Sequence, residues 1–214
     1  MARITVLGGT GYAGGHIVQE AAARGHQVTS YSRNAPENPV DGVTYETGSV
    51  LEHDVLAAAV ADTDAVIDAL SPRGDMAGKL EGIVNDLVNL LEGTSTRLGV
   101  VGGASSLLVS EGGPRLIDTA PPAPEVADEI QTGITVLQLL SDYTGQVDWF
   151  YVSPAALFGS WAPGEATGTY RTSDDILLVD DEGISQISGA DFAKAIVDEI
   201  ETPSHHQSRF HVAN

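Results

Sequence analysis

The chain has 214 residues with 10 basic and 30 acidic side chains, which give a formal net charge of −20, and it contains no cysteine. Such a charge repels nucleic acid backbones and anionic membrane surfaces, and no apolar run approaches the roughly 20 residues that a membrane helix needs. The absence of cysteine excludes disulfides and thiolate chemistry, so any redox reaction would need a cofactor.

The first half of the chain alternates β-rich and helical segments. The apolar run that begins at Arg3 is too short for a signal peptide and, with the absence of cysteine, this favours a cytoplasmic protein. We predict strands at residues 3–7, 27–32, 43–47 and 64–70, and helices at residues 16–24, 55–61 and 76–92.

The second half continues this alternation and then becomes less regular. We predict strands at residues 97–101, 147–152 and 210–212, helices at 126–143 and 189–200, a loop at 114–124 and a β-like piece at 176–179. Strands that alternate with helices predict an α/β fold with a Rossmann-like, doubly wound parallel sheet. The length favours one domain over residues 1–214, with a small substrate-side elaboration at about 154–188.

A glycine-rich turn follows the first predicted strand. Gly8 permits a sharp turn, Gly11 lets backbone N–H groups approach a pyrophosphate, and Gly14 lets the next helix pack closely. A merely tight turn is the alternative, but this position between a strand and a helix is the context that a dinucleotide fingerprint requires. The same predicted cofactor site includes Thr10, Tyr12 and Ala13.

The residues after the second predicted strand indicate which dinucleotide is bound. An NAD site usually has an acidic residue there, about 20 residues beyond the glycines, to hold the ribose 2′-hydroxyl. This chain has Arg33 instead, which can pair bidentately with a 2′-phosphate. We therefore predict NADP(H) in preference to NAD(H); a solvated loop arginine is the alternative.

No tyrosine in the chain is followed four residues later by the lysine with which reductases of this general class often lower a tyrosine pKa. A carbonyl or alcohol reaction with an internal proton donor is therefore disfavoured. Reduction of a flavin or quinone has a looser requirement, because the ring is poised to accept hydride and water can supply the proton.

Four segments, residues 8–14, 97–107, 148–158 and 187–193, carry a resemblance that extends over nearly the whole chain. The sequence resembles the atypical short-chain dehydrogenases/reductases of the NADH-flavin reductase kind, and is similar to biliverdin/flavin reductases and NmrA-like proteins. The resemblance implies an NAD(P)-binding reductase with a flavin as a candidate substrate.

The resemblance also assigns site residues. It implies that Ala69 and Leu70 line the cofactor, that Ser105 is the active-site serine near the nicotinamide, and that Pro154 forms a wall of the nicotinamide pocket. Gly102, at the end of the fifth strand, belongs to the same predicted site. Relatives commonly have Gly-Asp after the third strand, whereas this chain has Ser49 as the second residue, so adenine recognition there would use backbone groups.

Several polar residues have simpler interpretations than catalysis. Ser105 has no G-x-S-x-G context and is more consistent with substrate positioning or a turn hydrogen bond than with nucleophilic attack. The acidic residues at 174–175 and 180–182 indicate a solvated loop, and the histidines at 205, 206 and 211 lack zinc spacing, so we predict no metal site. Trp149 is expected in the core, Trp161 over a planar substrate, and Asp191 at a helix start.

The leading hypothesis is an NAD(P)H-dependent oxidoreductase that reduces a flavin or another small planar acceptor without a Tyr-Lys pair. One alternative is a non-catalytic NADP(H)-binding redox sensor of the NmrA-like kind. A second is an NAD-dependent epimerase or dehydratase. A homodimer is compatible with the sequence, and no nucleic acid or membrane partner is expected.

Overall fold

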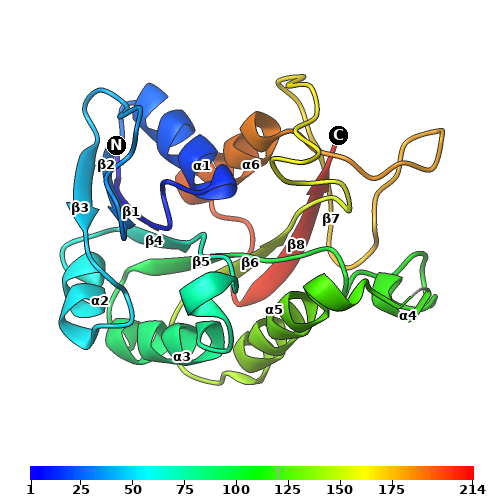
Figure 1. Ribbon diagram of the computed structural model, residues 1–214, viewed down its shortest axis with the longest axis horizontal. Coiled ribbons are helices and arrows are strands. Elements are labelled where there is room, and N and C mark those ends of the chain that lie inside the picture. Colours follow the sequence, from blue (N-terminus) through cyan, green and yellow to red (C-terminus); the bar gives the residue numbers. More distant parts are fainter. Residues whose placement is uncertain (120) are drawn as a thin grey trace.

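The computed structural model describes residues 1–119 and 121–214, and every side chain among them except that of residue 75. Within these residues the chain forms one eight-stranded sheet in the order β3-β2-β1-β4-β5-β6-β8-β7 (Figure 1). All neighbouring pairs are parallel except β7 with β8. The strands are β1 (Arg3–Leu7), β2 (Gln27–Ser32), β3 (Thr44–Thr47), β4 (Ala65–Asp68), β5 (Arg97–Val101), β6 (Trp149–Ser153), β7 (Arg171–Ser173) and β8 (Ser208–Ala213).

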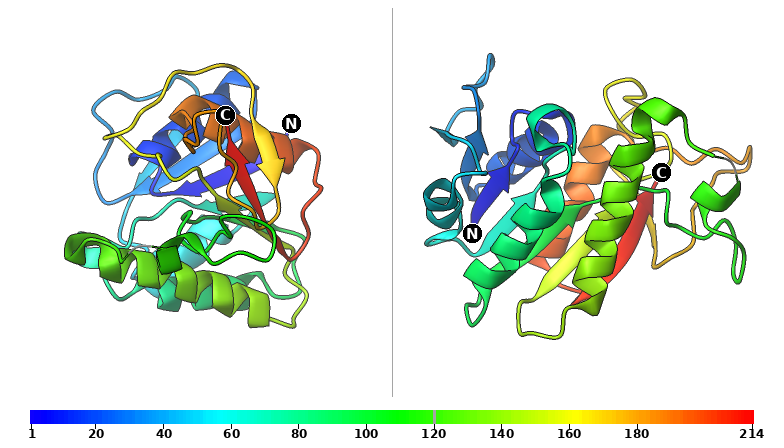
Figure 2. Two further views of the ribbon diagram at one scale, coloured as in Figure 1. Left: turned by 90° about the vertical axis from the view of Figure 1, so that its right-hand side faces the viewer. Right: turned by 60° about the horizontal axis from the view of Figure 1, so that its bottom comes forward.

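Helices cover both faces of the sheet, as the edge-on view in Figure 2 shows. One face packs against α1 (Tyr12–Ala23) and α6 (Gly189–Glu201), and the other against α2 (His53–Val60), α3 (Leu80–Leu91) and α5 (Pro124–Asp142). Two short helices, η1 (Gly74–Met76) and α4 (Leu116–Thr119), lie in connecting segments. The Rossmann-like parallel sheet predicted from the alternation is therefore confirmed.

The two helix layers enclose separate apolar cores. The core beneath α1 and α6 is built around Phe150, Phe192 and Phe210, which are nearly or completely inaccessible. The core beneath α2, α3 and α5 contains Leu87 and Trp149, and Trp149 is 2% exposed, as the sequence predicted. The sheet is buried on both sides, which is why most strands read as short apolar runs in the sequence.

Element boundaries differ from prediction where glycine or exposure hides the pattern. The first helix begins at Tyr12 rather than at residue 16, because its glycine-rich first turn carries no apolar periodicity. The helix predicted at 76–92 is α3, which begins at Leu80, because Gly78 has a φ of +68° that is incompatible with an α-helix.

Two predictions in the irregular C-terminal half were wrong in detail. The β-like piece at 176–179 contributes only an isolated bridge at Ile176, and the edge strand β7 lies earlier, where three polar residues pair with β8 by their backbone. The predicted loop at 114–124 contains the single-turn helix α4, and residue 120 of that loop lies outside the described residues. In the described part of the chain, no helix has the length and apolar character to cross a membrane.

Candidate functional site

The residues predicted to bind the cofactor converge on one edge of the sheet. The pairing register sets Leu7 beside Tyr31 and Asp68, and Val101 beside Val152, so the parallel strands end at a common level. The segments that leave these strand ends carry every predicted site residue: Gly8, Thr10, Gly11, Tyr12, Ala13, Gly14, Arg33, Ser49, Ala69, Leu70, Gly102, Ser105 and Pro154. Ligands of doubly wound sheets bind at this carboxyl edge.

The glycine turn has no room for side chains at two of its three spaced glycines. Gly8 has a φ of +81°, and a Cβ there would lie 2.8 Å from the carbonyl oxygen of Ala69. A Cβ at Gly14 would lie 2.2 Å from the carbonyl oxygen of Gly8, which shows how closely α1 approaches the turn. Gly11 donates its N–H to Gly8 at 2.9 Å, so the turn is closed by its own backbone.

The turn leads into a helix N-terminus that suits an anion. Gly11 is the N-cap of α1 and supplies no side-chain cap, and the first turn of the helix contains no acidic residue. The N-terminal backbone N–H groups and the positive end of the helix dipole are therefore available to a phosphate. In a chain with a net charge of −20, this local positive potential is what a pyrophosphate requires.

Two serines of β2 support the turn and were not identified from the sequence. The Ser32 hydroxyl accepts a hydrogen bond from the Thr10 N–H at 3.3 Å, and Ser30 is fully buried below Gly9, where a Cβ would lie 2.3 Å from its hydroxyl oxygen. Both hydroxyls are small enough to lie under the backbone of the turn. Their role depends on a contact between β2 and the turn, which no local motif reveals.

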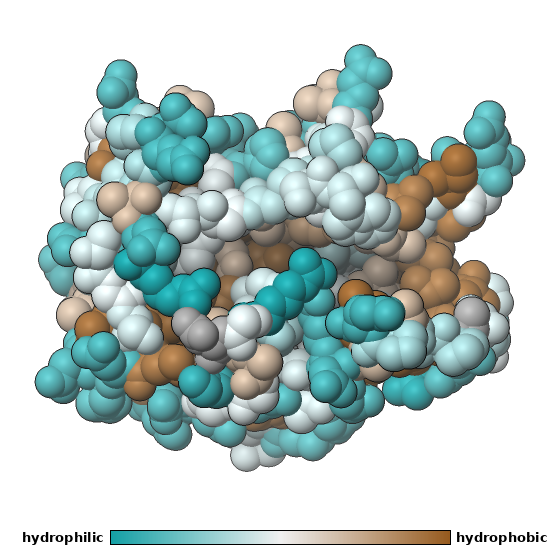
Figure 3. Space-filling view, in the orientation of Figure 1, coloured by the Kyte–Doolittle hydropathy of each residue, from teal (hydrophilic) through white to brown (hydrophobic). Residues whose placement is uncertain are grey.

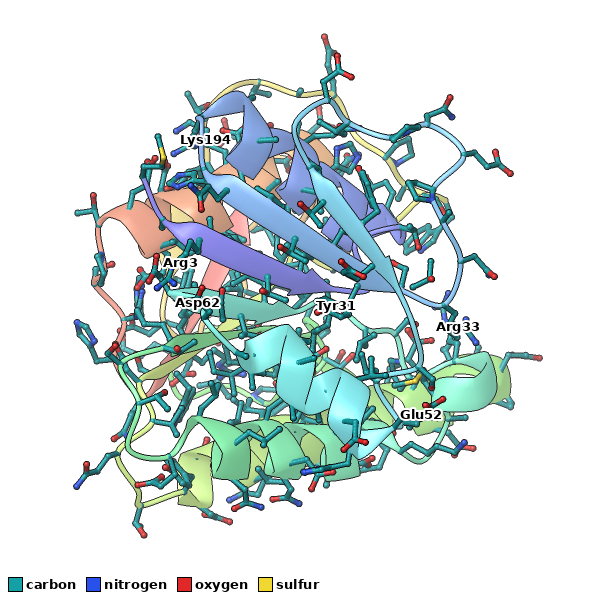
Figure 4. All side chains as sticks on the ribbon, turned by 90° about the vertical axis from the view of Figure 1, so that its left-hand side faces the viewer. Arg3, Tyr31, Arg33, Glu52, Asp62 and Lys194 are labelled. Carbon is teal, nitrogen blue, oxygen red and sulfur yellow. The ribbon has the colours of Figure 1, made fainter. Side chains whose placement is uncertain are left out.

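Arg33 and Ser49, which the sequence assigns to the adenine end of the cofactor, follow β2 and β3. Figure 4 shows Arg33 beyond the end of β2, on the same side of the molecule as Glu52 at the start of α2. The Ser49 hydroxyl accepts the Leu51 N–H at 3.4 Å, so this serine also stabilises the turn into α2. The Arg33 side chain, predicted to pair with a 2′-phosphate, is exposed one residue beyond the end of β2.

The end of β4 holds a buried carboxyl group that sequence reasoning missed. Asp68 is 1% exposed; its Oδ1 accepts the Leu70 N–H at 3.0 Å, whereas its Oδ2 is buried without a hydrogen-bond partner. Burial raises the pKa of Asp68 to about 7. The protonated, neutral form of this carboxyl group is therefore populated near physiological pH. Asp68 lies directly before the predicted cofactor residues Ala69 and Leu70.

The segment after β5 is held from below by Tyr151. The Tyr151 hydroxyl accepts the Gly103 N–H at 3.3 Å and donates to the Gly133 carbonyl oxygen of α5 at 3.1 Å. A Cβ at Gly102 would lie 2.0 Å from the Tyr151 ring, so only glycine fits there. Burial raises the pKa of Tyr151 to about 12, so the hydroxyl stays protonated while it bonds to the backbone of both segments.

Ser105 and Ser106 lie in the loop that Tyr151 supports. The backbone carbonyl of Ser105 accepts the Ile117 N–H at 3.0 Å, and the Ser106 hydroxyl accepts a hydrogen bond from Arg209 at 2.8 Å. Ser106 therefore anchors the loop to β8. Ser105 is half-buried and remains the serine of this loop that is predicted to position a substrate.

The segment after β6 lies across the edge and reaches the glycine turn. Its Ala156 and Leu157 N–H groups bond to Ser185 at 3.2 Å and 2.9 Å. The Tyr12 ring meets that of Phe158 edge-to-face at 5.4 Å, and the Tyr12 hydroxyl donates to the Pro163 carbonyl oxygen at 3.2 Å. The predicted residues Tyr12 and Pro154 thus belong to two segments that touch.

Below this segment are two further buried groups that no motif indicated. His211 of β8 is completely buried, and its Nδ1 lies 2.9 Å from the Ser153 carbonyl oxygen. The His211 Nε2 and the Ser153 hydroxyl are buried without hydrogen-bond partners. Burial lowers the pKa of His211, so the ring is neutral at physiological pH.

Asp191 has a structural role. It lies in the first turn of α6, is 2% exposed, and accepts hydrogen bonds from the Thr167 and Gly168 N–H groups, both at 2.8 Å. Burial opposes its ionisation, but these bonds and those from Ser188 and Asn214 outweigh it and lower the pKa of Asp191. This carboxylate joins the helix start, as predicted, to the 167–169 segment and the C-terminus.

Two surface hollows in the described part of the chain lie away from the glycine turn. A hollow of about 230 Å³ between β1, β2 and α2 is bordered by Arg3, Tyr31 and Asp62 (Figure 4), and one of about 280 Å³ lies between the starts of α2 and α3. Neither hollow includes the glycine turn. Among the described residues, no group of three or more metal-ligating side chains is assembled.

Figure 3 shows a hollow that crosses this face of the molecule between the α1/α6 layer and the α3/α5 layer. Apolar surface is visible inside the hollow and around its right-hand end, where Figure 1 places the segments around α4 and before α6. A partly apolar cleft beside an anion-binding turn can hold an extended dinucleotide at one end and a second molecule at the other.

Comparison with known proteins supports this description. Residues 8–203 match the model of the family described as NAD(P)H-binding. The YwnB protein of Bacillus subtilis, described as uncharacterized, is 36% identical over 220 residues, which cover 99% of this chain and 98% of YwnB.

Two solved structures are similar to this chain by nearly the same TM-score and the same sequence identity. A Streptococcus pneumoniae protein provisionally named an NADH-flavin reductase has a TM-score of 0.87 and 32% identity, with 100% of both chains covered. A Bacteroides thetaiotaomicron protein provisionally named an epimerase has a TM-score of 0.86 and 32% identity, covering 99% of this chain and 96% of that one. The fold is therefore shared by proteins named for different chemistries, and the site must decide between them.

Proposed function

Because this chain belongs to the NAD(P)H-binding family, we propose that it is an NADPH-dependent oxidoreductase that reduces a flavin or a similar planar acceptor. The observation that carries the proposal is the closed glycine turn and the uncapped α1 N-terminus that follow β1. They lie at the same edge of the sheet as the ends of the neighbouring strands β4, β5 and β6. We assign the pyrophosphate to residues 8–14 and the acceptor side to residues 154–188.

The choice of NADPH rests on Arg33. A guanidinium offers two parallel N–H donors to a phosphate, whereas an NAD site needs a carboxylate for the ribose hydroxyls. Arg33 is exposed beyond the end of β2, at the distance along the chain where that carboxylate would stand. The backbone around Ser49 would border the adenine.

The nicotinamide end is assigned to the residues that follow the next three strands. Ala69 and Leu70 would line one side, the Gly102 backbone the floor, and Pro154 the opposite wall. Bound NADPH would supply hydride at this position. Ser105 would orient the acceptor by a hydrogen bond.

We base the acceptor class on the Tyr-Lys pair that the sequence lacks, since no tyrosine is followed four residues later by a lysine. The sequence of α5, residues 124–142, contains neither tyrosine nor lysine. An acceptor whose ring takes up hydride directly and then a proton from water needs neither group. This favours a flavin or quinone over a ketone, whose developing alkoxide requires a positioned acid.

The test is NADPH oxidation in the presence of riboflavin or a small quinone, compared with NADH and with an Arg33→Ala variant. We expect saturable turnover that prefers NADPH, and about a 10- to 100-fold loss of kcat/KM for NADPH but little change for NADH in the variant. Turnover at the uncatalysed rate with every acceptor would contradict the proposal.

A non-catalytic redox sensor is the second candidate, because the absence of a Tyr-Lys pair is also compatible with cofactor binding alone. It predicts tight NADPH binding by calorimetry, dependence of that affinity on Arg33, and no consumption of the cofactor. The two candidates therefore differ in one readout, the oxidation of bound NADPH.

A further inference from the structure

Three segments form the end of the cleft that lies beyond the predicted nicotinamide position, and they are named here the acceptor-end loops: residues 104–118, 154–162 and 174–187. They are bonded to one another. The Leu108 N–H donates to Asp175 and the Leu177 N–H to Leu108, both at 2.8 Å, while the Leu157 N–H donates to Ser185 at 2.9 Å. These backbone bonds make the loops a continuous rim.

The acceptor-end loops concentrate the exposed apolar side chains of the molecule. Of the seven large hydrophobic residues that are exposed in the described part of the chain, five lie on these loops. They are Val109, Leu157, Trp161, Val179 and Ile184, with Trp161 the most exposed of the five at 66%. Figure 3 shows apolar surface gathered at this end of the hollow. Exposed apolar patches that border a cleft mark binding surfaces.

The same loops carry a strong negative charge. They contain seven carboxylates and one arginine: Glu111, Arg115, Asp118, Asp174, Asp175, Asp180, Asp181 and Glu182. Arg115 is paired with Asp118 at 2.8 Å. Two arginines reach the loops from the sheet, and Arg209 bonds to Asp175 and Ser106, while Arg171 bonds to the backbone oxygens of Val179 and Asn214.

Apolar contact combined with this charge selects the kind of molecule that fits. An aromatic ring system gains from burial against the exposed side chains. A phosphate monoester on the same molecule brings about −1.5 to −2 charges. If the ring lies beside the nicotinamide, the cofactor fills the cleft on one side, so any tail must extend between or past the acidic loops.

We propose that the acceptor end accepts planar molecules without phosphate, neutral or cationic, and discriminates against their phosphorylated forms. Riboflavin and small quinones are then substrates of the right class, whereas FMN is repelled. This inference rests on the proposed function for its identification of the bound ring. Its physical basis is the set of exposed apolar side chains on loops that also carry seven carboxylates, with Arg115 and Arg209 already paired to two of them.

The experiment compares riboflavin with FMN in two readouts, flavin fluorescence quenching on binding to the NADP⁺-loaded protein, and NADPH oxidation. At 10 mM salt we expect riboflavin to bind about tenfold more tightly than FMN and to have the higher kcat/KM. The difference should shrink at 0.5 M salt, because the screening length falls from about 30 Å at 0.01 M to a few ångströms.

A pair of matched variants separates the loop charges from the charge of the whole protein. Asp181→Asn combined with Glu182→Gln removes two exposed carboxylates from the rim, and Glu81→Gln combined with Asp86→Asn removes two from α3. The first variant should improve FMN binding about threefold or more at low salt and leave riboflavin binding unchanged. The α3 variant should change neither.

The outcomes distinguish this inference from the function on which it rests. Equal affinity for FMN and riboflavin at low salt, or equal effects of the two variants, would overturn the inference even if turnover is present. Selective binding of riboflavin without any NADPH oxidation would support the inference and contradict the reductase proposal.

Discussion

Gly14 and Gly15 are neighbours in the first turn of α1 but have different surroundings. A Cβ at Gly14 would lie 2.2 Å from the Gly8 carbonyl oxygen, whereas the nearest atom to a Cβ at Gly15 is the Gly9 carbonyl oxygen at 3.7 Å, an ordinary contact. The sequence alone identifies Gly14 as a member of the glycine fingerprint, but only the packing shows why its neighbour is not equivalent.

Replacement of these two glycines by alanine should therefore have opposite effects. We expect Gly14→Ala to lower the free energy of unfolding by about 1–3 kcal/mol and to weaken NADPH binding at least tenfold, because the turn must move away from α1. Gly15→Ala should stabilise the protein by up to about 1 kcal/mol, since alanine is the better helix former. Urea unfolding and calorimetric NADPH titration of both variants test this; equal losses would contradict it.

The Asp68 carboxyl makes stability depend on pH. Its folded pKa of about 7 lies above the ordinary unfolded value of about 3.9, so the folded state favours the protonated form. The protonated carboxyl makes its full contribution to the free energy of unfolding below about pH 4, and this contribution is lost as the pH rises through 7. The loss arises because ionisation would place a negative charge on a buried carboxyl group whose Oδ2 has no hydrogen-bond partner.

Asp68→Asn should remove this dependence, because the amide oxygen can still accept the Leu70 N–H while no charge is buried. We expect the variant to exceed the native chain in stability by an amount that grows from pH 5 to pH 8, reaching roughly 2–4 kcal/mol, and then levels off. Denaturant unfolding at several pH values measures the difference. The exposed Asp86→Asn is the control, and a difference for Asp68→Asn that stays constant with pH would be evidence against the assignment.

At the scale of elements, the sequence predicts the parts of the fold that local rules determine. The strands at 3–7, 27–32 and 97–101 end where predicted. The first and third contain short apolar runs followed by glycine, and the second consists largely of β-branched, aromatic and small polar residues. The three-residue edge strand β7 could not be found, because it is polar and is specified only by backbone pairing with β8. The glycine turn is equally local, and its position between β1 and α1 was predictable from the sequence.

The remaining parts of the candidate site depend on contacts between distant segments. Ser32 supports Thr10 across 22 residues, Tyr151 supports Gly103 across 48, and Asp191 holds Thr167 across 24. Each residue type is ordinary in its local sequence, and no spacing rule links it to its partner. The burial of Asp68 is not predictable from the sequence either, because an acidic residue that ends a strand usually lies in solvent.

At the scale of the whole molecule, a net charge of −20 affects more than the acceptor end. Under the proposed function the cofactor would bring further negative charge, and the uncapped α1 N-terminus and the guanidinium of Arg33 would act against the field of the protein. Salt screens the repulsion from distant carboxylates more strongly than it screens the short contacts within the pyrophosphate site. Moderate salt is therefore expected to assist the entry of NADPH as well as that of any anionic acceptor.

The same charge predicts that salt stabilises the folded chain. Exposed pairs such as those of Arg3 with Asp62 and of Arg115 with Asp118 lose strength when screened, but each contributes only about 0–1 kcal/mol. Repulsion among 30 carboxylates opposed by 10 basic groups is the larger effect. We expect Tm to rise by about 5 °C between 10 mM and 0.5 M NaCl, equivalent to roughly 2 kcal/mol. Calorimetry in KCl should give the same rise and equiosmolar glucose a much smaller one, whereas a Tm that falls with salt would show that the ion pairs outweigh the repulsion.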